Sequence, residues 1–186
     1  RYLTQLDAMG AAIVVTGDHG MKPKHDDKGD PCVIYLQDLL DEWVGKDKAR
    51  VILPITDPYV VHHGALGAFA TDYLPEDANV EDIIAKLTAT PDIICVLNRA
   101  DACARFELPE DRIGDIVVIS SENMTLGTSE SRHDLAALDE PLRSHGGLTE
   151  QEVPFIVNRQ LPDLGNAPDL RNFDAFHVAC QAATLV

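Results

Sequence analysis

Residues 11–21 read Ala-Ala-Ile-Val-Val-Thr-Gly-Asp-His-Gly-Met. The apolar, β-branched run over residues 11–16 stops at Gly17, which is typical of a short strand buried on both faces, as in a parallel sheet. Asp18 and His19 follow directly, at the carboxyl end of that strand. Ligands bind at this end of the strands in open α/β sheets. The segment therefore predicts an α/β fold with a ligand site where the strand ends.

Composition sets the class of protein. The chain has 186 residues, of which 45% are apolar and 25% charged, the balance of a soluble globular domain. No apolar run approaches the roughly 20 residues that cross a bilayer, so we expect no membrane partner. The net charge of -16 would repel nucleic acid. A small anionic substrate is still compatible with this charge, because bound divalent cations would reverse the local field.

Further strands and helices are predicted by the spacing of apolar residues. Residues 33–44 carry them every three or four positions, which predicts an amphipathic helix ending near Gly45. Strand and helix patterns then alternate from residue 59 to residue 120, the order of a small α/β lobe. Residues 124–141 are polar and turn-rich, so we expect a loop there. The predicted strands span residues 50–55, 59–71, 92–98, 115–120 and 153–158, and further helices span residues 80–88, 100–106 and 173–185.

The cysteines and the first residues bear on the compartment and on completeness. No two cysteines form a Cys-x-x-Cys pair, which indicates reduced thiols and a cytoplasmic protein. The chain starts at Arg1 rather than at a methionine, and its first seven residues read like the end of a helix. We therefore expect a fragment of a longer protein, with cleavage of a signal peptide as the alternative. The cysteines are Cys32, Cys95, Cys103 and Cys180.

Asp18 and His19 are the first candidate metal ligands. Carboxylate oxygen and imidazole nitrogen both bind Zn²⁺, at about 2.0–2.2 Å. Neighbouring side chains in a regular strand point to opposite faces, but Gly17 and Gly20 permit the irregular backbone that would let these two converge. The alternative is a turn in which the aspartate caps the backbone and the histidine is merely exposed. For an isolated Asp-His pair, that turn is the commoner outcome.

His145 is the second candidate. It lies in the loop Ser144-His145-Gly146-Gly147, shortly before the predicted strand 153–158. A histidine in a surface loop is the alternative, since a single residue is a weak signal. The combination says more than either site does, because an Asp-His-Gly strand end and a later His-Gly loop frame most of the chain.

The two motifs together resemble the alkaline phosphatase superfamily and, within it, the phosphonoacetate hydrolase family. The first motif is residues 15–25, Val-Thr-Gly-Asp-His-Gly-Met-Lys-Pro-Lys-His. The second is residues 144–158, Ser-His-Gly-Gly-Leu-Thr-Glu-Gln-Glu-Val-Pro-Phe-Ile-Val-Asn. The resemblance covers essentially the whole chain but only the C-terminal part of that family's catalytic domain. It implies a partial alkaline-phosphatase-like α/β core over residues 1–56 and 141–186, with an inserted lobe over residues 57–140. Because this lobe lies between the two motifs, we expect it to cap the site, with a purely structural insertion as the alternative.

The chemistry that this resemblance implies is cleavage of the carbon–phosphorus bond of phosphonoacetate to acetate and phosphate at two zinc ions. Asp18 and His19 correspond to ligands of one zinc and His145 to a ligand of the other. The nucleophilic threonine and the remaining ligands would lie upstream of Arg1, so no catalytic residue is assigned within the chain. We therefore expect the isolated chain to be inactive and to bind zinc weakly, because structural and catalytic zinc sites need three or four protein ligands.

Other residues have a role only if the lobe covers the site. His62 and His63 would then contact the substrate carboxylate, although packing within the lobe is the simpler interpretation. His25 either lines the mouth of the site or lies in a solvated loop. Arg132 and Arg143 have the chemistry to bind a carboxylate or phosphonate, with a surface position as the alternative.

Three other readings stay open at this point. Within the superfamily, a nucleotide pyrophosphatase/phosphodiesterase or a phosphomutase shares the Asp-His and His elements. A module that kept the sheet and lobe only as an interaction surface is a third, non-catalytic possibility. A homodimer is one assembly compatible with the sequence, which does not fix the oligomeric state.

Overall fold

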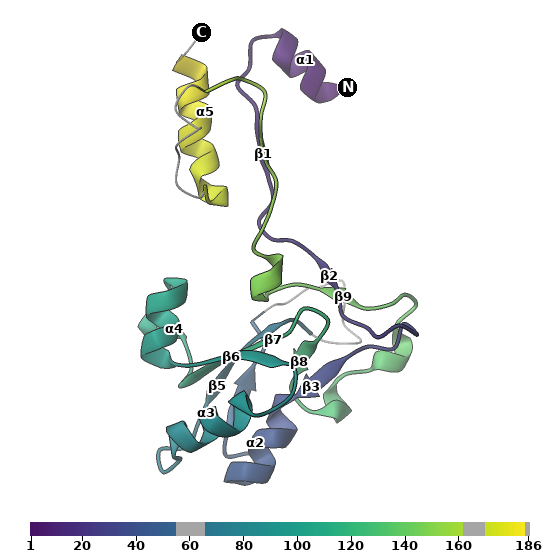
Figure 1. Cartoon of the computed structure of the whole chain (residues 1–186), viewed down its shortest axis with the longest axis vertical. Helices are drawn as coiled ribbons and strands as arrows, with labels where there is room; N and C mark the ends of the chain where they lie inside the picture. Colours follow the sequence, from purple (N-terminus) through teal and green to yellow (C-terminus); the bar gives the residue numbers. More distant parts are fainter. Residues whose placement is uncertain (55–65, 162–169, 185–186) are drawn as a thin grey trace. The chain divides into compact units, whose positions relative to one another are not determined.

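The structure, a computed structural model, describes residues 1–54, 66–161 and 170–184. Their contacts divide the chain into two compact units (Figure 1). The smaller unit comprises Arg1–Gly20 and Glu152–Val186, and the larger unit comprises Met21–Gln151. Both combine helices with small sheets, so the predicted mixed α/β class is confirmed. No helix in the described residues is long and apolar enough to cross a membrane.

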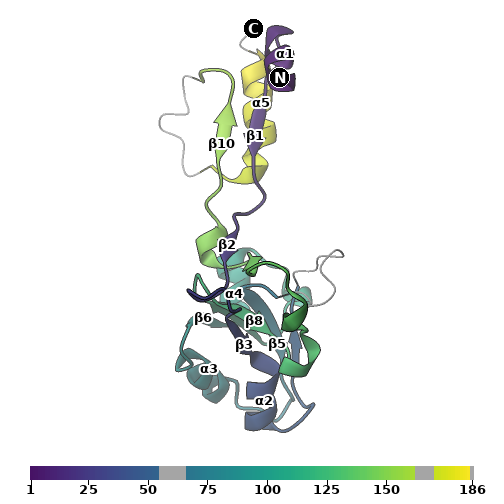
Figure 2. The same ribbon diagram turned by 90° about the vertical axis from the view of Figure 1, so that its right-hand side faces the viewer.

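The smaller unit is a pair of strands with a helix packed against it. β1 and β10 pair in an antiparallel ladder, with Val14 opposite Val157. α5 contacts β1 (Figure 2), and its Val178 and Ala182 are buried among the strand residues. The elements are α1 (Tyr2–Ala8), β1 (Val14–Thr16), β10 (Phe155–Val157) and α5 (Ala175–Thr184).

The surroundings of β1 correct the prediction of a parallel strand buried on both faces. β1 runs antiparallel to β10, and Val15 and its partner Ile156 are 39% and 58% exposed. Both line a groove of about 250 Å³ that also borders α1. The apolar cluster with α5 forms on the face of Val14 and Val157. Strand content was therefore predicted correctly, but not the pairing direction.

The larger unit contains a four-stranded sheet in the order β4-β5-β7-β6. Every neighbouring pair is antiparallel, so β5 and β6 run in the same direction with β7 between them. α3 leads from β5 to β6, and α4 leads from β6 to β7. The bounds are β4 (Arg50–Ile52), β5 (Phe69–Tyr73), α3 (Val80–Thr88), β6 (Ile93–Asn98), α4 (Arg99–Phe106) and β7 (Ile116–Ser120).

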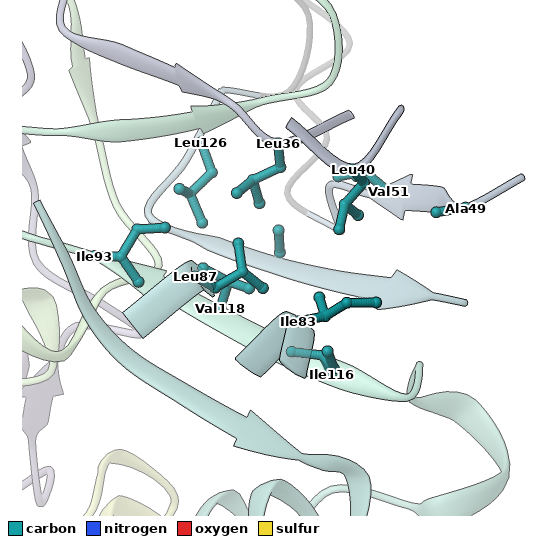
Figure 3. Close-up of a cluster of buried hydrophobic side chains, with 11 residues drawn as sticks. Leu36, Leu40, Ala49, Val51, Ile83, Leu87, Ile93, Ile116, Val118 and Leu126 are labelled. Carbon is teal, nitrogen blue, oxygen red and sulfur yellow. The ribbon is translucent and has the colours of Figure 1, made fainter. Parts of the chain in front are cut away.

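Alternation along β7 supplies a core on each face of this sheet. Ile116 and Val118 pack with residues of α2 (Leu36–Val44) and α3 on one face (Figure 3). Val117 and Ile119 pack with Ala102 of α4 in a second cluster. All five residues of β7 are buried, and the first four of them, residues 116–119, form a continuous apolar run.

Local signals place α3 where the sequence predicted it. The side chain of Asn79 accepts a hydrogen bond from the Asp82 backbone N–H at 3.2 Å and caps the first turn. Lys86 forms an ion pair with Asp82 at 2.8 Å, one turn apart. α4 has the same type of cap, in which the Asn98 side chain accepts a hydrogen bond from the Asp101 backbone N–H at 2.9 Å.

The predicted helix over residues 33–44 starts three residues later than expected. Val33–Tyr35 forms strand β3, and α2 covers Leu36–Val44 before Gly45 ends it with φ 101°. β3 pairs in parallel with β8 (Thr125–Gly127), which lies inside the segment predicted to be a loop. The pairing of residues 33–35 with β8 therefore outweighs the helical spacing of apolar residues at the start of the predicted helix.

The remaining elements lie between these larger ones. β2 (Lys22–Pro23) pairs antiparallel with β9 (Arg143–Ser144). The predicted cap lobe over residues 57–140 lies within the larger unit, and its role as an insertion stays a prediction. Residues 55–65, which include His62, His63 and most of the predicted strand 59–71, lie outside the described residues. Short 3-10 helices cover Glu110–Arg112, Glu130–Arg132, Leu135–Ala137, Leu148–Glu150 and Asn172–Asp174.

Candidate metal centre

Asp18 and His19 form a turn in the smaller unit, directly after β1. One carboxylate oxygen of Asp18, Oδ1, accepts a hydrogen bond from the His19 backbone N–H at 3.1 Å. The His19 ring nitrogen Nδ1 lies 2.8 Å from the Gly20 carbonyl oxygen. Because a carbonyl can only accept, Nδ1 carries the proton, and Nε2 is the nitrogen with a lone pair in the neutral ring.

The two donor atoms of this turn lie slightly farther apart than two ligands of one zinc ion. His19 Nε2 lies 3.7 Å from Asp18 Oδ2. Two ligands of one tetrahedral zinc ion are separated by about 3.3 Å, given bond lengths of about 2.0–2.1 Å. Histidine ligands commonly donate their second ring N–H to a carbonyl, as Nδ1 does here to Gly20. The side chain of Asp18 is 85% exposed, so its carboxylate is accessible to an ion.

His145 lies in the larger unit, immediately after β9. Its backbone oxygen accepts a hydrogen bond from the Ala68 N–H at 2.8 Å, which ties the loop to the residue before β5. The side chain is half-buried. β9 is paired with β2, with Ser144 opposite Lys22. The segment that precedes His145 therefore lies beside the segment that begins three residues after His19 in the sequence.

The structure brings Asp18 and His19 together but leaves their relation to His145 a prediction. The first two belong to the smaller unit and His145 belongs to the larger. Among the described residues, no group of three or more His, Cys, Asp or Glu side chains is arranged to hold a metal ion. Two ligands are fewer than the three or four of a strong zinc site.

The other predicted site residues have local roles. His25 Nδ1 lies 2.8 Å from the Asp26 carbonyl oxygen, inside its own loop. Arg143 is exposed and donates from Nη2 to the Met21 carbonyl at 3.3 Å. Arg132 is also exposed. These contacts do not test a role toward a substrate, so the roles suggested by the sequence stay predictions.

Two buried charged residues were missed by sequence reasoning. Lys24 and Glu150 are 0% and 2% exposed and face each other, with Lys24 Nζ 3.1 Å from Glu150 Oε1. Lys24 follows the Asp-His-Gly motif, and Glu150 follows the His145 loop. Gly147 and Glu150 have the spacing of the first residue of a helical turn and the glutamate that caps it. This local pattern could have drawn attention to Glu150.

Lys22 and Lys24 are both tied to the turn between β7 and β8. Lys22 Nζ lies 2.8 Å from a carboxylate oxygen of Glu122, and Lys24 Nζ donates to the Glu122 carbonyl at 2.6 Å. The neighbouring Lys22 ammonium group lowers the pKa of the Glu122 carboxyl. Glu122, which belongs to the predicted cap lobe, thus contacts two residues of the segment that follows the Asp-His-Gly motif.

Comparison with known families decides the assignment. The sequence model of the type I phosphodiesterase / nucleotide pyrophosphatase family matches residues 1–148, which is most of the chain. The chain belongs to this family. The Asp-His-Gly motif at the end of β1 lies within the residues that the type I phosphodiesterase / nucleotide pyrophosphatase model matches.

Phosphonoacetate hydrolases are among the most similar proteins. Two crystal structures of the phosphonoacetate hydrolase from Sinorhizobium meliloti 1021, one with phosphonoformate and one with phosphonoacetate, are 74% identical to this chain, with a TM-score of 0.92. The match covers 98% of this chain and 44% of that chain. A phosphonoacetate hydrolase of Penicillium oxalicum is 61% identical over 28 residues, 14% of this chain and 39% of that protein. The resemblance predicted from the two motifs is confirmed.

A more distant solved structure shares the fold alone. Murine ectonucleotide pyrophosphatase / phosphodiesterase 5 is 20% identical, with a TM-score of 0.57, and the match covers 99% of this chain and 44% of that chain. The chain thus spans less than half the length of both solved proteins.

Proposed function

We propose that this chain forms the C-terminal part of a phosphonoacetate hydrolase, which cleaves the carbon–phosphorus bond of phosphonoacetate to acetate and phosphate. The observation that carries the proposal is the 74% identity over 98% of the chain to the Sinorhizobium meliloti enzyme. That enzyme has been crystallised with phosphonoacetate. The geometry of the Asp18–His19 turn supports the same proposal.

Each candidate ligand has a role in this proposal. Asp18 and His19 hold one zinc ion through Oδ2 and Nε2, the two atoms that lie 3.7 Å apart. His145 holds the second ion. The zinc pair, when bound, supplies positive charge that activates the nucleophile and stabilises the phosphoryl oxygens. In a chain of net charge -16, such cations also offset the repulsion of an anionic substrate.

The chain's own contribution is to hold ligands, not to attack phosphorus. In this proposal, the threonine nucleophile implied by the resemblance belongs to the part of the relative's length that this chain does not span. Residues 57–140 would cover the site and exclude water, as caps do. A cytoplasmic location, consistent with four free cysteines, and a homodimer are further parts of the proposal.

Phosphate release tests the function directly. We define the extended protein as the Sinorhizobium meliloti enzyme in which this chain replaces the corresponding C-terminal part. With zinc supplied, we expect the extended protein to release phosphate from phosphonoacetate and the isolated chain to release none. We expect His145→Ala in the extended protein to lower kcat/KM by more than the roughly 10–100-fold typical of residues that only support a metal ligand.

The matched control is His177→Ala, which removes an exposed histidine of α5 whose Nε2 contacts Gln181. It should leave phosphate release unchanged. Turnover of a nucleotide phosphodiester but not of phosphonoacetate would favour the phosphodiesterase alternative, which the family match also supports. A zinc-loaded, folded extended protein that turns over neither substrate would favour the non-catalytic module.

A further inference from the structure

Lys24 and Glu150 form an ion pair that is completely buried in the larger unit. Their side chains are 0% and 1% exposed, and Lys24 Nζ lies 3.1 Å from Glu150 Oε1 across 126 residues of sequence. Lys24 Nζ also donates to the Glu122 carbonyl at 2.6 Å. Burial lowers the pKa of the Lys24 ammonium group, and the Glu150 carboxylate opposes this effect. Each charge is thus compensated by the other.

Glu150 fixes the backbone of the loop that carries His145. Its Oε2 accepts a hydrogen bond from the Gly147 backbone N–H at 2.7 Å, and its Oε1 accepts one from the Thr149 hydroxyl at 2.7 Å. A Cβ atom on residue 147 would lie 2.7 Å from Glu150 Oε2. The carboxylate therefore packs directly on the glycine, and a side chain at residue 147 would have to displace it.

The same loop is held from its other side by the segment that leads into β5. Ser144 Oγ donates to the Leu66 carbonyl at 2.5 Å, and Ala68 N–H donates to the His145 carbonyl at 2.8 Å. The backbone is therefore fixed before, at and after His145. Of these contacts, only the one after His145 depends on a buried charge.

Lys24 links this arrangement to the segment that follows the Asp-His-Gly motif. Its backbone N–H donates to the Leu142 carbonyl at 2.8 Å, which continues the β2–β9 ladder. Lys24 lies six residues after Asp18 in the sequence. The ion pair thus joins the continuation of the first motif to the loop of the second.

Stability alone is a weak reason for such a pair. Buried ion pairs can often be replaced by apolar side chains of similar volume without loss of stability, because removing charges from water is costly. Apolar side chains cannot accept the Gly147 N–H, however. Glu150 therefore supplies a contact that an apolar residue would lose, the hydrogen bond that fixes the backbone at Gly147.

We propose that Glu150 is a positioning residue for His145 and that Lys24 holds its carboxylate in place. This inference rests on the proposed function, since it assumes that His145 binds zinc. Orientation of a metal ligand by neighbouring hydrogen bonds typically affects metal affinity by about 10–100-fold. The pair would therefore govern occupancy of the second zinc ion without contacting it.

Two double variants separate positioning from packing. K24M/E150M removes both charges and the acceptor for the Gly147 N–H, whereas K24M/E150Q removes both charges and retains an acceptor oxygen. In the isolated chain, we expect the Gly147 amide to exchange at least 10-fold faster in K24M/E150M than in K24M/E150Q, measured by NMR. This readout requires neither zinc nor activity.

Zinc affinity completes the test in the extended protein, measured by chelator competition. We expect K24M/E150M to bind the second zinc ion about 10–100-fold more weakly than K24M/E150Q. Should K24M/E150M fail to fold, Glu150→Asp serves the same purpose, because it keeps the charge but withdraws the oxygen from Gly147. The Val118 amide, in the core strand β7, reports folding in all variants.

Equal Gly147 exchange and equal zinc affinity in the folded variants would overturn the proposal, provided that the unmutated extended protein binds two zinc ions and releases phosphate. If the unmutated protein does neither, the proposed function fails and the role toward a zinc ligand fails with it. The exchange rates would still decide whether Glu150 fixes the loop.

Discussion

Asp72 places a carboxyl group inside the sheet of the larger unit. It is 0% exposed and lies on β5 between Val51 of β4 and Ile116 of β7. Neither carboxyl oxygen has a hydrogen-bond partner among the described residues. Desolvation disfavours the charged form and raises the pKa of Asp72 to about 8.

The stability of the chain should therefore depend on pH through this residue. Above about pH 4 the unfolded chain releases the Asp72 proton, while the folded chain keeps it up to about pH 8. Because the folded chain then binds one more proton than the unfolded chain, Asp72 should lower the free energy of unfolding by about 1.4 kcal/mol for each unit that the pH rises across this window. Urea unfolding at several pH values measures this slope.

Asp72→Asn should remove this contribution, because the amide does not titrate. Glu81→Gln, at an exposed position of α3, is the control and should leave the slope unchanged. An identical slope in the wild type and Asp72→Asn would show that Asp72 is ionised in the folded chain.

The turn at Asp18 and His19 could be predicted from single residues, whereas the buried ion pair could not. That this turn binds a metal ion stays a prediction. Asp18 and His19 are adjacent, and the flanking glycines indicate the turn that their side chains need. Lys24 and Glu150 lie 126 residues apart. Gly147 and Glu150 have the spacing of a capped turn, but this spacing does not indicate that the carboxylate is buried. Charged residues are usually exposed, so only tertiary structure reveals this pair.

Among the elements, local signals decided which predictions succeeded. α3 has a capping asparagine, an apolar stripe and an ion pair one turn apart, and its bounds are as predicted. β8 has only three residues, all buried, and its partner β3 is distant in sequence. The first residues of the predicted helix 33–44 belong to that strand pair. Short strands that depend on distant partners carry too little local pattern to predict.

One close approach between elements gives a second stability prediction. A Cβ atom on Gly114 would lie 2.5 Å from the Asp72 carbonyl oxygen and 2.6 Å from Thr71 Oγ1. Gly114 N–H also donates to Thr71 Oγ1 at 2.7 Å. We expect Gly114→Ala to lower the free energy of unfolding by about 1–3 kcal/mol, the usual cost of overpacking.

Urea unfolding of the Gly114→Ala chain checks this value at one fixed pH. Unchanged stability would show that the loop before β7 can move away from β5. The approach seen between Gly114 and β5 would then not constrain the fold.

At the scale of the whole molecule, the sequence predicted which proteins this chain resembles, but not how its distant segments pack. Two motifs at opposite ends of the chain were enough to indicate phosphonoacetate hydrolases. The boundaries between the two compact units follow Gly20 and Gln151. Asp18 and His19 therefore belong to one unit and His145 belongs to the other. Short motifs do not encode the packing between distant segments, so the dinuclear site stays a proposal.

The most direct test is a crystal structure of the extended protein with zinc and phosphonoformate, with anomalous data collected at the zinc absorption edge. We predict two zinc ions about 3.5–4 Å apart. Asp18 and His19 should bind one ion at about 2.0–2.2 Å, and His145 should bind the other. A structure in which the His145 ring lies away from both ions, or in which Asp18 and His19 bind none, would contradict the account.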